Sequence, residues 1–340
     1  MRRALLPCLL AAVLGGCGAA AEVRERDLVS DAPAAPAPRP ATTPDGSARG
    51  GVRIAVITHG QASSGFWSIV KNGVDAAGRQ MDVAVTYRSP DVYSVASMSR
   101  QIDEAVASRP DGLVVSLPSP ALDRSVRRAV RAGIPVVSIN SGSDHFRRLG
   151  VLAHVGQEEG AAGAAAARRL AAAGVRHALC FNHEVGNAGT DTRCRAFSRA
   201  MRAAGRTSRT VGIVLTDVDR TQRRLAAAFA DPTVDGALTL SSNAAEPVLA
   251  AVRAAGRENS IAVGTFDLSP EVLRAVREGR LRFAIDQQAY LQGYLPVVLL
   301  GQLARYGLFA AQGEVIPTGP HFVTRATADQ AIRLSQRGIR

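Results

Sequence analysis

The sequence is poor in aromatic residues, which make up 4% of its 340 positions, and Lys71 is its only lysine. Its formal net charge of +12 therefore comes from arginines, which are scattered along the chain and form no basic cluster beside aromatic residues. Helix-turn-helix and zinc-finger spacings are also missing. We interpret the charge as solvated, arginine-rich helix faces, and the sequence argues against a nucleic-acid partner.

Motifs of the common enzyme classes are missing as well. The chain has no GxSxG, no HExxH, no Walker phosphate-binding loop, and no GxGxxG after its first apolar run. The sequence therefore predicts a protein that is not an enzyme and that needs no cofactor or metal ion.

Cysteine is scarce, with four residues in the chain, and two of them, Cys8 and Cys17, belong to an N-terminal export segment. The remaining two, Cys180 and Cys194, lack the CxxC spacing of a redox or metal site. In an oxidising compartment they form either a disulfide or two separate buried thiols, and the sequence leaves both alternatives open.

Long apolar segments are absent, and the apolar run at residues 4–13 is too short for a bilayer, which needs about 20 residues. It follows two arginines and precedes Leu-Gly-Gly-Cys at residues 14–17. This segment (1–17) resembles the signal peptide and lipobox of bacterial lipoproteins, which implies that Cys17 carries a lipid after cleavage. We expect an exported protein, lipid-anchored in the cell envelope, in the periplasm or on the outer face of the cytoplasmic membrane. An ordinary secretory signal with an incidental cysteine is the alternative.

The rest of the chain divides into a connection and a folded part. Residues 18–50 are rich in Ala and Pro and show no apolar period, which predicts a disordered tether. From residue 51 onward, short apolar runs alternate with amphipathic stretches, which predicts alternating strands and helices. The predicted strands cover residues 52–57, 83–87, 112–116, 135–139, 177–181, 210–215, 236–240, 261–264 and 281–285.

This alternation determines the fold class. Strands separated by helices form right-handed crossovers and parallel sheets, so the chain is predicted to be α/β. The strands are too many for one compact sheet of this kind, and they separate into two sets near residue 156. The sequence therefore predicts two similar lobes, with the ligand beyond the carboxyl ends of the strands.

Hydrogen-bonding and aromatic side chains follow several of the predicted strands. Amides, one carboxylate, one guanidinium and an aromatic pair recur at this position, which is typical of a binding cleft. The candidate binding residues are His59, Phe66, Trp67, Asn140, Arg193, Asn243, Asp267 and Gln287.

Three short motifs carry a family resemblance. Phe66-Trp67 opens the first predicted helix, residues 264–267 read Gly-Thr-Phe-Asp, and residues 285–288 read Ile-Asp-Gln-Gln. Their order and spacing resemble the type I periplasmic binding proteins, specifically the ribose-binding-like sugar receptors of ABC importers. The resemblance implies two Rossmann-like lobes joined by a three-crossing hinge. The expected N-terminal lobe is 51–156 plus 288–318, and the expected C-terminal lobe is 157–287 plus 319–330.

The resemblance also implies roles for the candidate residues. Phe66 and Trp67 match the sugar-stacking aromatics of the family, and Arg193 matches the arginine that reaches ligand hydroxyls. The family's other polar positions fall on His59, Asn243, Asp267 and Gln287.

Other interpretations of these residues remain open from the sequence. Trp67 also fits a position in the core, and Asp267 also fits a cap for the helix beginning near Ser269. His183 and Glu184 are kept outside the candidate set.

Two departures from the family pattern bear on the ligand. Asn140-Ser141 stands where ribose receptors have Asp-Arg, and Val218 stands where they have a phenylalanine that closes the sandwich around the sugar. We therefore expect a neutral ligand with several hydroxyls, and a sugar other than ribose, a polyol or a cyclitol is favoured.

The predicted function is a solute-binding lipoprotein that delivers such a ligand to an ABC permease, acting as a monomer. A ligand-binding sensor subunit feeding a membrane receptor or kinase is the alternative. The export segment and the missing DNA-binding helices exclude a transcription regulator.

Overall fold

The computed structural model describes residues 51–60, 65–90 and 94–340. The predicted signal peptide, the tether and the lipidation site Cys17 lie outside these residues. All the described residues belong to one compact unit, and their strands form two six-stranded sheets.

The first sheet has the strand order β11-β5-β4-β3-β1-β2, and all its neighbouring strands are parallel. Its strands are β1 (Arg53–Ile57), β2 (Ala84–Arg88), β3 (Gly112–Ser116), β4 (Val136–Ile139), β5 (Ala153–Gly156) and β11 (Val315–Pro317).

The second sheet has the order β12-β10-β9-β8-β6-β7 and is parallel except for β12, which runs antiparallel to β10. Its strands are β6 (His177–Asn182), β7 (Thr207–Gly212), β8 (Gly236–Thr239), β9 (Ala262–Phe266), β10 (Phe283–Asp286) and β12 (His321–Val323). We call each sheet with its helices the first and the second lobe.

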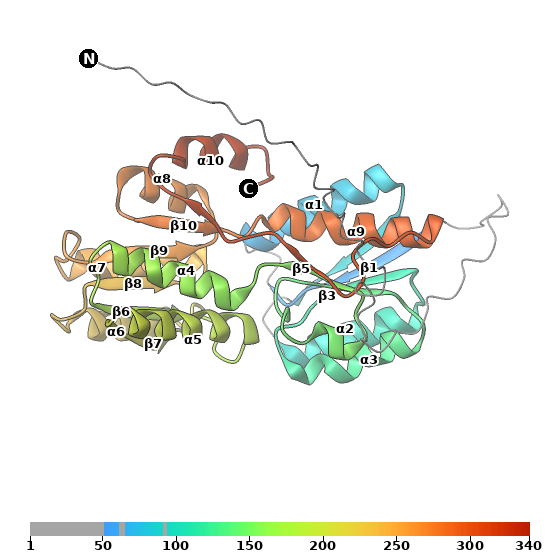
Figure 1. The fold of residues 1–340 in the computed structure, drawn as a ribbon, viewed down its shortest axis with the longest axis horizontal. Helices are drawn as coiled ribbons and strands as arrows, with labels where there is room; N and C mark the ends of the chain where they lie inside the picture. The colour runs from blue at the N-terminus through green and yellow to red at the C-terminus, as the bar shows by residue number, and fades with distance from the viewer. Residues whose placement is uncertain (1–50, 61–64, 91–93) are drawn as a thin grey trace, which may run out of the picture. The chain divides into compact units, whose positions relative to one another are not determined.

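Helices cover both faces of each sheet. In the first lobe, α1 and α9 pack side by side on one face (Figure 1), and α2 and α3 cover the other. In the second lobe, α4 and α5 cover one face, and α6, α7, α8 and α10 the other. Their bounds are α1 (Gly65–Met81), α2 (Val95–Ala107), α3 (Asp123–Arg131), α4 (Glu159–Ala172), α5 (Ala188–Ala203), α6 (Val218–Phe229), α7 (Ser242–Ala254), α8 (Pro270–Glu278), α9 (Ala289–Tyr306) and α10 (Ala328–Ser335).

Alternate residues of the central strands supply the cores on the two faces of a sheet. Ile54 and Val56 of β1 pack on the side of α1 and α9, whereas Ala55 and Ile57 pack on the side of α2 and α3. Because both faces are covered, β1 has no polar side, which explains why it appears in the sequence as a continuous apolar run.

The chain crosses between the two sheets three times: after β5, after β10 and after β11. The predicted fold class, α/β with two Rossmann-like lobes and a three-crossing hinge, is therefore confirmed. The antiparallel β12 is the one departure from parallel pairing in the described sheets.

Most predicted strands agree with the structure to within about two residues at each end, but one is displaced and three short strands were not predicted. The strand expected at 210–215 corresponds to β7, which ends at Gly212. The prediction is displaced because this edge strand is mostly polar and gives little apolar signal. The strands β5, β11 and β12 were not predicted, since three or four residues are too few for a recognisable period.

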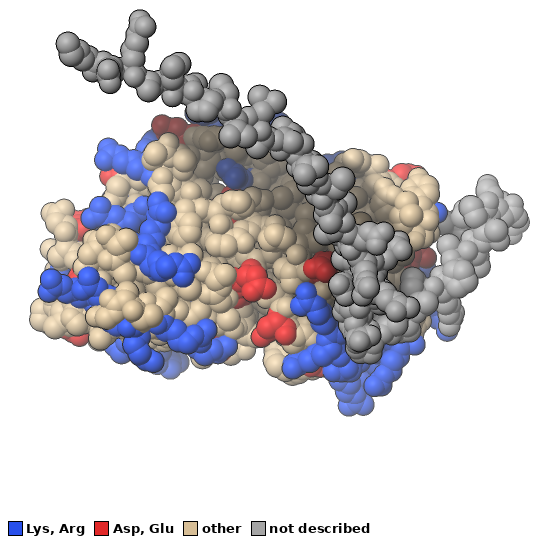
Figure 2. Space-filling view, viewed as in Figure 1, with Lys and Arg blue, Asp and Glu red and all other residues tan. Residues whose placement is uncertain are grey.

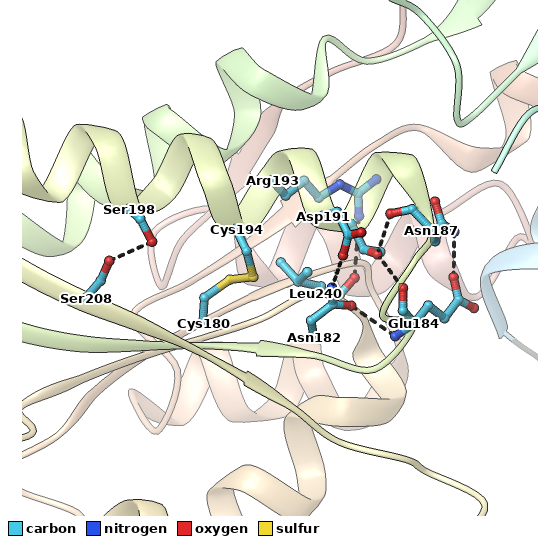
Figure 3. Close-up of a disulfide and its surroundings, with 11 residues drawn as sticks. Cys180, Asn182, Glu184, Asn187, Asp191, Arg193, Cys194, Ser198, Ser208 and Leu240 are labelled. Atoms are coloured by element: carbon cyan, nitrogen blue, oxygen red, sulfur yellow. Dashed lines mark hydrogen bonds between the residues drawn. A yellow bond between two sulfur atoms is a disulfide. The ribbon is translucent and has the colours of Figure 1, made fainter. Parts of the chain in front are cut away.

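Cys180 of β6 and Cys194 of α5 form a disulfide (Figure 3). This decides between the two alternatives that the sequence left open. The bond ties α5 to the second sheet directly beside Arg193, the residue that precedes Cys194 in the chain.

The surface of the described part carries many basic side chains, several of which adjoin one another on the face shown in Figure 2. In this part of the chain, none of the helices combines the length and the apolar character that a membrane crossing requires.

Candidate functional site

A cavity of about 750 Å³ lies beyond the carboxyl ends of strands from both sheets. His59 enters it after β1, Asn140 after β4, and Asp267 after β9. The cavity is lined by every one of the candidate binding residues, namely His59, Phe66, Trp67, Asn140, Arg193, Asn243, Asp267 and Gln287.

A buried hydrogen-bond network forms the second-lobe side of this cavity. Arg193 on α5 donates from Nη2 to Glu159 Oε1 over 2.8 Å and from Nε to Glu159 Oε2. Its Nη2 also donates to Gln287 Oε1 over 2.8 Å, and its guanidinium carbon lies 4.5 Å from the ring centre of Phe266. Gln287 Nε2 donates in turn to Asp267 Oδ1. The charge of Arg193 is therefore compensated by Glu159 within the protein itself.

Asp267 has a backbone φ of 66°, in the left-handed region that residues other than glycine rarely adopt. Burial raises the pKa of its carboxyl to about 7, although Arg193 and the hydrogen bond from Gln287 act in the opposite direction. Ser269 is the N-cap of α8 and accepts from Val272 N, so helix capping does not account for Asp267. A carboxyl that titrates near neutral pH can accept hydrogen bonds from ligand hydroxyls, and it can donate one when protonated.

His59 belongs to a second polar cluster, which joins the two lobes. Its Nδ1 lies 2.8 Å from Ser116 Oγ, and its Nε2 lies 3.3 Å from Asn187 Nδ2. Burial lowers the pKa of His59 to about 4, so the ring is neutral near pH 7, with Nε2 accepting from the amide. Asn187 also donates to Glu184 Oε2 over 2.7 Å (Figure 3), and its Oδ1 accepts from Ser141 Oγ over 3.3 Å. Asn187 thus links residues of the first lobe to the start of α5.

The aromatic pair lies at the first-lobe wall. Trp67 is only 6% exposed and packs in the core of the first lobe, but its ring also lines the cavity. It meets the rings of His59 and Phe66 edge-on, with ring centres 4.9 and 5.1 Å apart. A Cβ at Gly60 would lie 1.5 Å from Trp67 Nε1, so the indole needs glycine there. Trp67 therefore has both roles at once: it packs in the core of the first lobe and lines the cavity.

The two remaining asparagines of the candidate set differ in burial, since Asn140 is buried and Asn243 is exposed. Asn140 Nδ2 donates to Gln292 Oε1 over 3.3 Å, and Gln292 Nε2 donates to Thr318 Oγ1 over 3.1 Å. Asn140 is therefore connected to the chain segments that cross between the lobes. Asn243, in the first turn of α7, is exposed and lies at the margin of the cavity.

Sequence reasoning missed Glu159 and gave no role to Asn187 and Glu184. Glu159 follows β5 by three residues, so the post-strand rule would have found it had β5 been recognised as a strand. Val218 was expected at the second-lobe wall, but it is 59% exposed and does not line the cavity. Residues 213–215, which end the run predicted as a strand, and the following Thr216 line the cavity instead.

The chemistry of this lining is that of a hydrogen-bonding pocket. Within the described ranges, no group of three or more His, Cys, Asp or Glu side chains is placed to hold a metal ion. Amides, a guanidinium and carboxyl groups supply donors and acceptors, and Trp67 supplies an apolar ring.

Comparison with known proteins decides the family. The family model of the periplasmic binding protein domain matches residues 54–307. The chain belongs to this family. The sequence-based identification as a type I, ribose-binding-like periplasmic binding protein is therefore confirmed.

Relatives of this periplasmic binding protein include a carbohydrate transporter from Acidothermus cellulolyticus, solved in complex with myo-inositol. It is 32% identical, with a TM-score of 0.80, over 85% of this chain and 100% of the other. The xylose/arabinose-binding protein XylF of Sulfolobus acidocaldarius is 26% identical, over 81% of this chain and 71% of the relative. A solute-binding protein from Agrobacterium vitis with bound D-fucose has a TM-score of 0.74 at 23% identity, over 83% of this chain and 98% of the other, and shows the same fold.

These relatives are solute-binding proteins, and periplasmic binding proteins are not enzymes. Members of the family are periplasmic or extracellular.

Proposed function

We propose that this periplasmic binding protein is the solute-binding lipoprotein of an ABC importer. It binds a small neutral polyhydroxylated ligand, such as a sugar, a polyol or a cyclitol, in the 750 Å³ cavity. The observation that carries the proposal is the linked set Arg193, Gln287 and Asp267 facing the same cavity as Trp67. Hydroxyl groups need both donors and acceptors, which this set provides, and the C–H face of a ring packs on an aromatic side chain.

The binding roles in this proposal follow the geometry of the lining. Trp67 and Phe66 stack on the ligand, while Arg193 and Asp267 donate to and accept from its hydroxyls. His59, Asn140, Asn243 and Gln287 supply the remaining polar contacts. The sugar and inositol ligands named for relatives support this class, and the relative with myo-inositol is 32% identical.

Transport requires that the permease recognise the loaded protein. In the proposal, the N-terminal lobe is 51–156 plus 288–318, and the C-terminal lobe is 157–287 plus 319–330. The lobes of the monomer close on the ligand about the three crossings, because only the closed state lets the ligand contact both. The permease then binds the closed form.

A thermal-shift screen of the purified protein tests the ligand class, using sugars, polyols, cyclitols, amino acids and phosphorylated compounds. A neutral polyhydroxylated compound at about 1,000 times its dissociation constant should stabilise the protein by about 4 kcal/mol. Asp267→Ala should weaken binding about tenfold or more, since a ligand hydroxyl loses its partner. Glu246→Gln, at an exposed residue of α7 outside the cavity lining, is the matched control. Stabilisation by an amino acid or a phosphorylated compound alone would contradict the proposal.

The lipid anchor is tested separately. Cys17→Ser should abolish lipid labelling and release the protein from membranes. A mature N-terminus at any residue other than Cys17 would exclude this part of the proposal.

A further inference from the structure

The charges along the inner wall of the cavity are not balanced. Three acidic side chains, Glu159, Glu184 and Asp267, lie at or directly behind this wall, with Arg193 as the buried guanidinium among them. Arg193 is held by both oxygens of Glu159. Among the residues that the structure describes, the two acidic side chains that line the cavity itself, Glu184 and Asp267, therefore have no cation of their own in the inner wall.

Glu184 has one oxygen available to a ligand. Its Oε2 accepts from Asn187 Nδ2 over 2.7 Å. No hydrogen bond to Oε1 is formed by the described residues, and His183 Nε2 lies 3.9 Å from it. The side chain is 23% exposed and lines the cavity, so Oε1 is within reach of a bound molecule.

The neighbours of Glu184 leave it charged. Burial opposes its ionisation, but the imidazoles of His59 and His183, the hydrogen bond from Asn187 and the charge of Arg193 together hold its pKa below the usual value. Burial in turn lowers the pKa of both histidines, so they contribute no full positive charge near pH 7.

The exposed cationic side chains of the lining do not neutralise the carboxylate of Glu184. Arg220 and Arg224 also line the cavity, and both are exposed to solvent. Arg224 Nη1 donates to Gly212 O, which directs its guanidinium to the backbone of β7. Solvent and salt screen such exposed charges, whereas a group inside the cavity interacts with Glu184 at low dielectric.

We propose that the cavity prefers a polyhydroxylated ligand with one protonated amine, an amino sugar or aminocyclitol, whose ammonium group contacts Glu184 Oε1. This departs from the neutral ligand of the proposed function in one group, an ammonium in place of a hydroxyl, and otherwise rests on the proposed function, because the rest of the ligand uses the same hydroxyl-binding set. An ammonium group offers three donors and a full charge where a hydroxyl offers one donor. Hydrogen bonds that involve a charged partner are about twice as strong as neutral ones.

The test compares neutral compounds with analogues that carry an amine in place of one hydroxyl. Isothermal calorimetry of the full protein would use glucose with glucosamine, galactose with galactosamine, and scyllo-inositol with scyllo-inosamine, plus glucuronate as an anionic probe. At about pH 6 the amines are protonated, and Asp267, with a pKa of about 7, keeps its proton. At least one amine should bind about tenfold or more tightly than its neutral partner, and glucuronate should bind more weakly than glucose.

Glu184→Gln assigns the preference to this residue. The amide keeps an oxygen that can accept from Asn187 but removes the charge, so the amine-to-neutral affinity ratio should fall about tenfold. Glu246→Gln should leave that ratio as it is in the unaltered protein. If the neutral compounds bind and no amine binds more tightly, or if Glu184→Gln keeps the ratio, the amine proposal fails and the proposed function stands. If none of the neutral or amine compounds binds, both fail.

Discussion

At the residue scale, the cavity depends on polar side chains that are held by buried partners. The Arg193–Glu159 pair shows this most clearly, since both side chains are about 95% buried. Removing two charges from water has a large desolvation cost, which their attraction and further hydrogen bonds offset only when both partners are present. The pair therefore orients Arg193 toward Gln287, and loss of either partner leaves a buried charge without compensation.

Replacing one member of this pair should destabilise the protein more than replacing both. Arg193→Met leaves the Glu159 carboxylate buried without its cation, which costs about 3–5 kcal/mol. The double variant Arg193→Met/Glu159→Met should recover most of this loss, because neither charge remains. Urea unfolding of the two single variants and the double variant measures the difference, and additive losses would show that the two charges do not interact.

Binding of a neutral ligand should depend on pH through Asp267. Its pKa is raised to about 7, and a ligand hydroxyl that donates to the carboxylate favours the ionised form and lowers the pKa in the complex. Binding then releases a proton, so affinity rises with pH below about 7 and levels off above it. The charged groups near this carboxyl are Arg193 of α5, Glu159 of α4 and Asp286 of β10.

Calorimetry across this pH range, in buffers of different ionisation enthalpy, measures the released proton directly. Asp267→Asn cannot titrate and should bind weakly with a flat pH profile. If Asp267→Asn keeps the pH dependence of affinity seen in the unaltered protein, a group other than Asp267 is responsible for the titration.

At the element scale, helix packing positions the first-lobe wall of the cavity. The helices α1 and α9 cross with backbone in contact, because a Cβ at Gly73 would lie 2.1 Å from Tyr290 O, and one at Gly293 would lie 1.9 Å from Val70 O. The same two helices carry Trp67 and Gln292, which reach the cavity and the crossing segments respectively. Close contact between α1 and α9 therefore fixes both side chains relative to the first sheet.

Adding a methyl group at this crossing should separate the helices. Gly73→Ala should lower the free energy of unfolding by about 1–3 kcal/mol, because the obstruction is backbone and cannot rotate away. Gly160→Ala on α4 is the matched control, since its Cβ would meet only Thr192 Cγ2 at 4.0 Å, and helix propensity should make it neutral or slightly stabilising. Equal effects of the two substitutions in urea unfolding would mean that the α1–α9 crossing tolerates the extra volume.

At the scale of the whole molecule, the two sheets meet at the start of α5 as well as at the three crossings. Ala188 N donates to Pro118 O over 2.8 Å, and Asn187 contacts His59 and Ser141. These few polar contacts are weak compared with a hydrophobic interface, so a ligand that contacts both lobes can shift the balance between open and closed states.

Ligand should therefore close the lobes as rigid bodies. Small-angle scattering with a saturating ligand should give a smaller radius of gyration than scattering without it. Asp267→Ala at the same ligand concentration should show a smaller decrease, because fewer molecules are loaded. An identical radius with and without ligand in the unaltered protein would rule out closure.

The sequence alone determined the fold class and the family, and its eight candidate binding residues are a minority of those that line the cavity. Short apolar runs, such as those within β1 and β3, mark buried strands because both faces of these sheets are covered. In parallel sheets the carboxyl ends of neighbouring strands meet at one edge. The sequence therefore places polar residues after those runs, such as Asn140 and Asp267, in one cleft.

Only the tertiary structure decided how those residues are paired. Glu159 and Arg193 are 34 residues apart, and no local pattern signals that one compensates the charge of the other. The disulfide of Cys180 and Cys194, the position of Trp67 in both core and cavity, and the raised pKa of Asp267 likewise arise from distances and burial that the folded chain creates. Local periodicity follows from backbone geometry, whereas charge balance in a cavity depends on groups that folding brings together.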